Sequence, residues 1–122
     1  MADNNGGDNN SAFVYMGGNQ RVPEDVTHVR IHKSVKNIPR RAFSNCIRLI
    51  SIEMHDGVEI IEEDAFWCCE SLRGIKLPGV RVIGNHAFYN CKALEALEFG
   101  DKLETIGSNS FAFTSLRSIK LP

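Results

Sequence analysis

The sequence has no long hydrophobic run and no excess of charge of either sign. Its apolar stretches extend over only a few residues, which is too short for a membrane-spanning helix. The 14 Lys and Arg residues and the 15 Asp and Glu residues leave a formal net charge of -1. A chain so nearly neutral has no general electrostatic attraction to nucleic acid or to an anionic membrane. We therefore expect neither of them as a partner.

A secretory signal is also lacking, because the first residues have neither a basic start nor an apolar core. Residues 1–11 are rich in Asn, Asp and Gly, which bury little surface, and we expect them to be disordered. Four cysteines without a signal indicate free thiols in a reducing compartment. The predicted location is the cytoplasm, and the sequence leaves other locations open.

Signatures of catalysis, metal binding and cofactor binding are missing as well. There is no C-x-x-C pair, no H-E-x-x-H and no glycine-rich phosphate loop. His28 and His32 lie four residues apart on a predicted strand, which is about 13 Å and too far for one metal ion. No nucleophile is placed beside a base. We expect no enzymatic activity, no metal and no cofactor.

The sequence does contain a repeat of 22 or 23 residues. Three apolar columns recur at this spacing, and they are Phe43, Phe66, Phe88 and Phe111; Ile38, Ile61, Ile83 and Ile106; and Leu49, Leu72, Leu94 and Leu116. Each unit also holds an alternating stretch such as Leu72-x-x-Ile75-x-Leu77, which has the period of a β-strand. One unit cannot bury its apolar edge alone, so the units must stack as a solenoid with parallel strands.

The repeated pattern "LxxIxL…V…I…AFxxCxxL" resembles the BspA-type leucine-rich repeat, a family named for bacterial surface antigens. The resemblance covers about residues 27–122. It implies an α/β solenoid, a right-handed arc with a parallel sheet of about five short strands on its concave side and short helical turns on its convex side. It also implies surface recognition by repeats that have no catalytic activity of their own. The fourth unit departs from the pattern with "FAFTSL", in which Phe113 is assigned to the cysteine slot.

The repeat also predicts how the two ends are organised. Residues 12–26 are expected to form a capping hairpin that turns at Gly17-Gly18. Residues 27–122 form a repeat domain of about four and a half units, without a C-terminal cap. Its last apolar residues, Phe99, Ile106, Phe111, Ile119 and Leu121, are then expected beside an uncovered edge. Either this end self-associates, or the chain is a fragment of a longer array.

The cysteines divide into two kinds. Cys46, Cys69 and Cys91 each lie three residues before a framework leucine, so they are expected in the core as small apolar side chains. Cys68 aligns with Asn45 and Asn90, so it is expected to be the accessible thiol.

Two surfaces are candidates for binding. On the concave side, charged residues of alternating sign fall into columns across the strands, and they are Arg30, Glu53, Lys76, Glu98 and Lys120, with Arg73, Glu95 and Arg117 beside them. These charges form either a solvated ladder of cross-strand pairs or a mixed-charge recognition surface. On the convex side, Trp67 and Tyr89 are either exposed anchors for a partner or partly buried padding.

The predicted function is a non-catalytic leucine-rich repeat module that mediates protein–protein interaction. The alternative is a structural or adhesive segment of a larger repeat array. The identity of a protein partner does not follow from the sequence.

Overall fold

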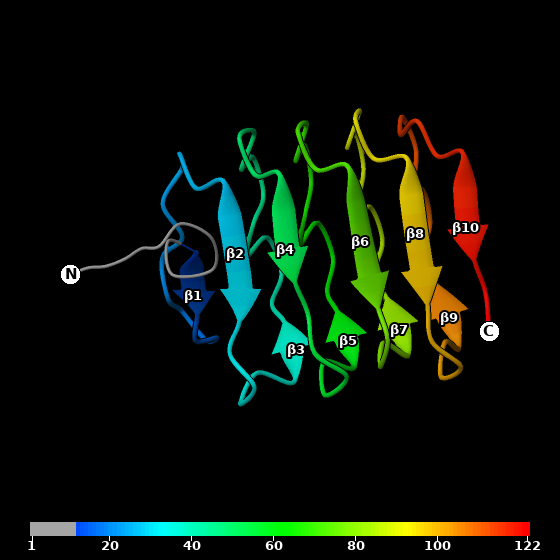
Figure 1. The fold of residues 1–122 in the computed structure, drawn as a ribbon, viewed down its shortest axis with the longest axis horizontal. Helices are drawn as coiled ribbons and strands as arrows, with labels where there is room; N and C mark the ends of the chain where they lie inside the picture. The colour runs from blue at the N-terminus through cyan, green and yellow to red at the C-terminus, as the bar shows by residue number, and fades with distance from the viewer. Residues whose placement is uncertain (1–11) are drawn as a thin grey trace.

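The computed structural model describes residues 12–122, in which short parallel strands stack side by side as a solenoid (Figure 1). The expected disorder of residues 1–11 lies outside the described residues. The strands on one side, here called the front sheet, are β1 (Phe13–Tyr15), β2 (His28–Ile31), β4 (Ser51–Glu53), β6 (Gly74–Leu77), β8 (Ala96–Phe99) and β10 (Ser118–Lys120). Backbone hydrogen bonds join β1-β2-β4 and β6-β8-β10 as two groups, and β4 and β6 lie side by side between them.

A second parallel sheet, the back sheet, runs behind the first, and the sequence interpretation did not include it. Its strands are β3 (Asn37–Ile38), β5 (Ile60–Ile61), β7 (Val82–Ile83) and β9 (Thr105–Ile106), paired in that order. The isoleucine that ends each of the first three strands is at most 1% exposed. The isoleucine column of the repeat therefore forms strands of its own.

The core is a set of ladders in which each turn repeats the contacts of its neighbour. The rings of Phe43, Phe66 and Phe88 stack nearly parallel, with centroids 5.1 and 5.0 Å apart. Phe111 continues the stack at 5.3 Å, and Tyr15 closes its other end edge-on at 5.0 Å. Offset aromatic pairs at such distances contribute about 0.5–1.5 kcal/mol beyond burial. The 22- or 23-residue spacing of the sequence is thus one step along this stack.

The expected helical turns are wrong, because no helix forms within residues 12–122. The turns that contain Ala42-Phe43, Ala65-Phe66, Ala87-Phe88 and Ser110-Phe111 are here called the Ala-Phe segments. In the first three of them, alternate amides bond in two different ways. Ser44 N donates to Arg41 O within the turn, whereas Phe43 N and Asn45 N donate to carbonyls of the next unit, 2.8 and 2.7 Å away. A helix would keep all these bonds inside the segment.

Positive φ angles explain why the segment does not become helical. Arg41 and Asn45 have φ of 61° and 63°, and two positions repeat this conformation in every later turn, namely Asp64 and Cys68, His86 and Asn90, and Asn109 and Phe113. A residue in the left-handed region interrupts a right-handed helix. Each Ala-Phe segment is therefore a chain of tight turns bonded to its neighbour.

The N-terminal segment does not form the expected hairpin. β1 pairs with β2 in parallel, with Tyr15 beside Ile31, so it adds a strand to the front sheet instead of folding back on itself. The turn after it does use Gly17 and Gly18, both with positive φ. Tyr15 is 1% exposed and Val26 is 8% exposed, so both lie within the core. The hairpin was inferred from glycine positions, which fix a turn but not the partner of the following chain.

At the C-terminal end, framework positions that are buried elsewhere become exposed. Ile106 is 49% exposed, Ile119 52% and Leu121 63%, while Phe99 stays buried at 6% and Phe111 is half-buried. The assignment of Phe113 to the cysteine slot is wrong, because its φ of 60° matches that of Asn45 and its side chain is 68% exposed. The fourth unit is one residue shorter than the others between its phenylalanine and its leucine. The deletion therefore falls after Phe113, not before it.

Candidate functional site

The front sheet carries the predicted charges in two columns that cross the strands. Lys76 aligns with Glu98, and Glu98 with Lys120, in the pairing of β6, β8 and β10. Arg30 on β2 aligns with Glu53 on β4 in the same column. All five occupy the third position of their strands and point away from the core. Glu53, Lys76 and Lys120 are exposed, whereas Arg30 and Glu98 are half-buried.

The second column lies directly before the strands. Glu95 N donates to Arg73 O at 2.9 Å, and Arg117 N donates to Glu95 O at 2.8 Å, so these three residues also follow one another across the sheet. Arg73 and Arg117 are exposed and Glu95 is half-buried. The structure therefore brings the predicted front-sheet residues into one surface.

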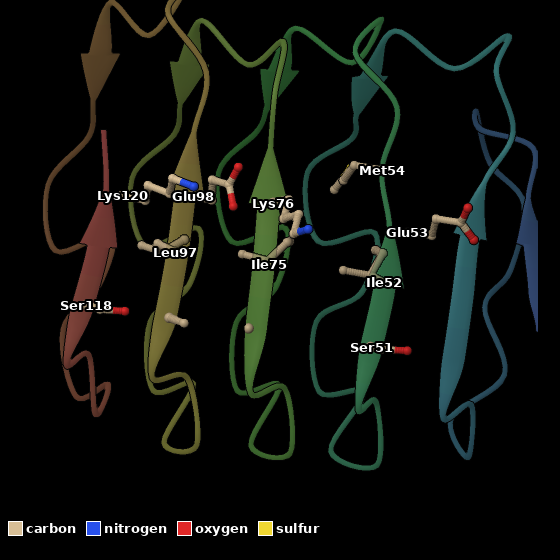
Figure 2. A pocket seen from close by; sticks show the side chains of 12 residues that line it. Ser51, Ile52, Glu53, Met54, Ile75, Lys76, Leu97, Glu98, Ser118 and Lys120 are labelled. Atoms are coloured by element: carbon tan, nitrogen blue, oxygen red, sulfur yellow. The ribbon is translucent and has the colours of Figure 1, made fainter. Parts of the chain in front are cut away.

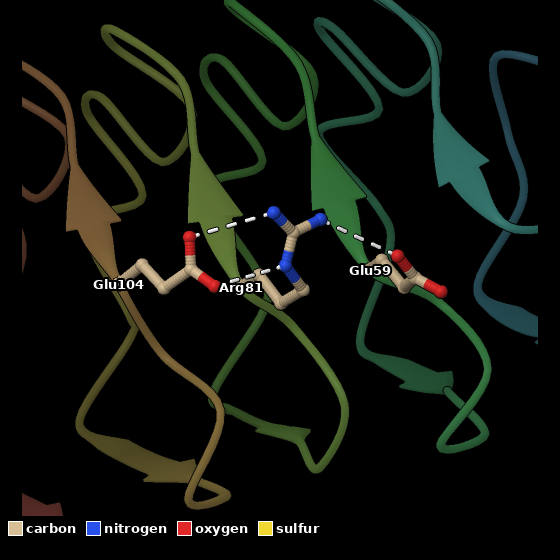
Figure 3. Close-up of polar contacts among 3 residues, drawn as sticks. All are labelled: Glu59, Arg81 and Glu104. Carbon is tan, nitrogen blue, oxygen red and sulfur yellow. Dashed lines mark hydrogen bonds and ion pairs between the residues drawn. The ribbon is translucent and has the colours of Figure 1, made fainter.

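Among residues 12–122, no ion pair at β6, β8 or β10 joins a charge of one column to a charge of the other. None links neighbouring charges within a column there either. The ion pairs lie elsewhere. Arg81, just before β7, bridges Glu104 at 3.1 Å and Glu59 at 3.4 Å (Figure 3). Arg40–Glu63 and Arg41–Asp64 lie at the Ala-Phe segments, at 3.6 and 3.7 Å. The charges that the two columns place at β6, β8 and β10 therefore form no ion pair with one another in this part of the chain, and they can meet solvent or a partner.

A shallow hollow of about 530 Å³ lies over β4, β6, β8 and β10, and the charges of the first column from Glu53 to Lys120 line it (Figure 2). Its floor includes small residues at the first position of β4, β6, β8 and β10, namely Ser51, Gly74, Ala96 and Ser118. Sequence reasoning missed this floor, although the signal was present, since a small residue recurs two places before Glu53, Lys76, Glu98 and Lys120. The hollow gives a ligand access to this floor beside the charges of the first column.

Trp67 and Tyr89 lie on the opposite side, next to the Ala-Phe segments. Both are half-buried, with rings stacked 6.2 Å apart at 7°. His86 and Phe113 each meet the Tyr89 ring edge-on, both at 5.4 Å. A hollow of about 560 Å³ beside them has a mixed lining that includes Arg41 and Asp64, which pair with each other. Trp67 and Tyr89 repeat at the surface the ring stacking of the core. As half-buried rings they fit both interpretations, an anchor for a partner and partly buried padding.

The thiols are all buried, so the expected accessibility of Cys68 is wrong. Cys46, Cys69 and Cys91 are at most 4% exposed, which confirms their core positions. Cys68 is only 9% exposed, and the side-chain amide of Asn90 donates to its sulfur at 3.2 Å. The short side chain is covered by the next turn, which alignment with Asn45 and Asn90 could not reveal.

Two further classes of site can be checked in the described part of the chain. Residues 12–122 contain no group of three or more His, Cys, Asp or Glu side chains placed to hold a metal ion. None of these residues belongs to a helix long and apolar enough to cross a membrane.

Comparison with known proteins identifies the repeat. The family model of the BspA type leucine rich repeat region (6 copies) matches residues 23–122. Comparison with curated proteins gives no match.

Several solved structures share the fold. A leucine-rich repeat protein of T. pallidum is 33% identical, with a TM-score of 0.72 over 76% of this chain and 44% of its own. A leucine-rich repeat protein from Bacteroides ovatus is 31% identical, with a TM-score of 0.72 over 77% of this chain and 24% of its own. A leucine rich cell surface protein from Faecalibacterium prausnitzii is 27% identical, with a TM-score of 0.57 over 79% and 33%.

The chain therefore spans less than half the length of each of these structures. The match to the family model covers nearly all of the described solenoid, and its repeat is the one whose ladders form the core. The chain belongs to the BspA-type leucine-rich repeat family.

Proposed function

We propose that this chain is a non-catalytic recognition module that binds a protein partner through its front sheet. The observation that carries the proposal is the hollow of about 530 Å³ lined by Lys76, Glu98 and Lys120, charges that form no ion pair with one another among residues 12–122. Exposed charges on a rigid sheet give specificity and orientation to a protein encounter. A surface with both signs also suits a protein better than a polyanion such as nucleic acid.

The alternative is a structural or adhesive segment of a longer array, and the C-terminal end supports it. Ile119 is 52% exposed, whereas Leu97, its partner in the register of β8 and β10, is 2% exposed. A further turn or a second copy stacked on this end would bury the same surface. Self-association through this end is part of this alternative.

Photo-crosslinking tests the two functions against each other. A crosslinking amino acid at Ala96, an exposed position on the floor of the hollow, should capture a discrete partner from an extract of the source cells. The same group at Trp67 serves as the control, because it lies on the opposite side of the solenoid. Capture of a partner from Trp67 alone would place recognition on the other face. Adducts only between copies of this chain would support the array.

A further inference from the structure

At β6, β8 and β10 the charges of the front sheet are arranged as bands, one sign to each strand. Arg73, directly before β6, and Lys76, within it, are both basic, and the floor residue Gly74 lies between them in the chain. The corresponding pair on β8 is acidic, and the pair on β10 is basic again. These pairs are Glu95 with Glu98 and Arg117 with Lys120.

The bands have a fixed spacing that a partner must match. Neighbouring strands lie about 4.8 Å apart, so three successive bands lie at 0, about 4.8 and about 9.6 Å along the solenoid. The register of β6, β8 and β10 places Lys76, Glu98 and Lys120 on one line, so the bands do not slip relative to one another. Figure 2 shows these three side chains following one another on adjacent strands.

An α-helix that lies along the solenoid matches this spacing. Positions i, i+3 and i+7 share one helix face and rise by about 4.5 and 10.5 Å, within about 1 Å of the bands. An extended segment places same-side residues at about 6.7 and 13 Å, so its second charge already falls between two bands. The charge register therefore favours a helix over an extended peptide.

The width of the bands suits the same partner. The two charges of each band are three residues apart along the chain, which corresponds to about 10 Å. An α-helix with its side chains is about 10–12 Å across, so one helix covers both charges of each band. Gly74 and Ala96 keep the floor low at its centre.

We infer that the partner of the front sheet presents an α-helix whose exposed charges alternate acidic, basic, acidic at intervals of three to four residues. The helix lies across β6, β8 and β10, with small or apolar residues toward the floor. This inference rests on the proposed role of the front sheet and adds to it the secondary structure and charge pattern of the partner.

The test is a pair of selections on the 122-residue protein. One displayed library consists of randomised single helices on a rigid scaffold, and the other of randomised proline-containing extended peptides of equal length. The control bait carries Arg73→Glu, Lys76→Glu, Glu95→Lys and Glu98→Lys, which inverts two bands and leaves the net charge unchanged. A smaller control with only Lys76→Glu and Glu98→Lys is used if circular dichroism shows that the fourfold variant is misfolded.

The helix library should yield sequences with acidic, basic and acidic residues three to four positions apart. A selected helix should bind the control bait at least tenfold more weakly, and selection on the control bait should invert the charges opposite β6 and β8. Enrichment of the extended library alone, with binding still lost on the control bait, would overturn the helical partner and leave the front sheet as a binding surface. Selected sequences that bind both baits equally would overturn both proposals. Failure of the helix library to enrich any sequence would also overturn the inference.

Discussion

At the scale of single residues, the surroundings of two buried thiols, Cys46 and Cys69, raise their pKa. Burial, together with the Glu24 carboxylate, raises the pKa of Cys46 from its ordinary value of 9.0 to about 11. The pKa of Cys69 also lies well above its ordinary value, because of a hydrogen bond with the Cys91 thiol and, after it, burial. Thiols that hold their protons are poor nucleophiles, so these side chains act as packing groups.

The raised pKa of Cys46 predicts a loss of stability in alkali. Above about pH 9 the unfolded chain releases this proton, whereas the folded protein keeps it until about pH 11. The contribution is complete below pH 9, so the free energy of unfolding should fall as the pH rises from 9 to 11. Urea denaturation at several pH values measures this change. In the Cys46→Ala variant the fall should be shallower, and an unchanged slope would contradict the assignment.

The sequence predicted burial correctly where the burial follows from a residue's position within one repeat unit. It failed where the burial depends on a contact with the neighbouring turn. Cys46, Cys69 and Cys91 fill an apolar slot that recurs with each unit, so their burial follows from spacing alone. The burial of Cys68 depends on the Asn90 amide of the next turn, 22 positions along the chain. No local pattern reports a contact of that kind.

At the scale of elements, the strands of the front sheet were predictable and the Ala-Phe segments were not. Period-2 alternation identifies a strand such as Gly74–Leu77 directly. The spacing of Ala, Phe and Cys fits a helical turn equally well as a chain of tight turns. The difference lies in positive φ angles at Arg41, Asp64 and His86, none of which is a glycine that would have indicated it. The charge columns were predicted, whereas the small floor between them was not.

The phenylalanine ladder predicts a large difference between inward and outward substitutions. Phe88→Ala removes a fully buried ring from between Phe66 and Phe111, and it should cost about 3–5 kcal/mol. Glu98→Ala removes a half-buried charge that none of the ion pairs among residues 12–122 includes, and it should cost less than about 1 kcal/mol. Chemical denaturation of both variants measures the costs. Equal losses would show that the inward and outward positions are wrongly assigned.

At the scale of the whole molecule, the two ends of the solenoid differ. Near the N-terminus, Tyr15 covers the phenylalanine ladder edge-on at 5.0 Å. At the C-terminal end, β10 and β9 are the last strands of their sheets, and their side chains are exposed. The apolar edge was predictable because the last unit has the same framework residues as the others, with no turn of the described chain beyond them.

This exposed edge predicts concentration-dependent association of the 122-residue chain. Ile119→Glu places a charge at the centre of the edge and should lower the association measured by light scattering across a concentration series. Ile47→Glu is the matched control, because Ile47 is 50% exposed and Ile119 52%, yet Ile47 lies away from this end. A wild-type chain that stays monomeric throughout the series, or equal effects of both substitutions, would show that the edge does not associate.

The direction of the bonds between turns has a mechanical consequence. Ladder bonds of both sheets, and bonds such as that from Phe43 N to Ala65 O, run from one turn to the next along the solenoid. Tension between the two ends of the described chain would therefore load these bonds one turn after another instead of shearing a whole sheet at once. Each detached turn of 22 or 23 residues would add about 70 Å of slack. We therefore expect a solenoid of this kind to lengthen under tension by the detachment of single turns, while its remaining turns stay folded.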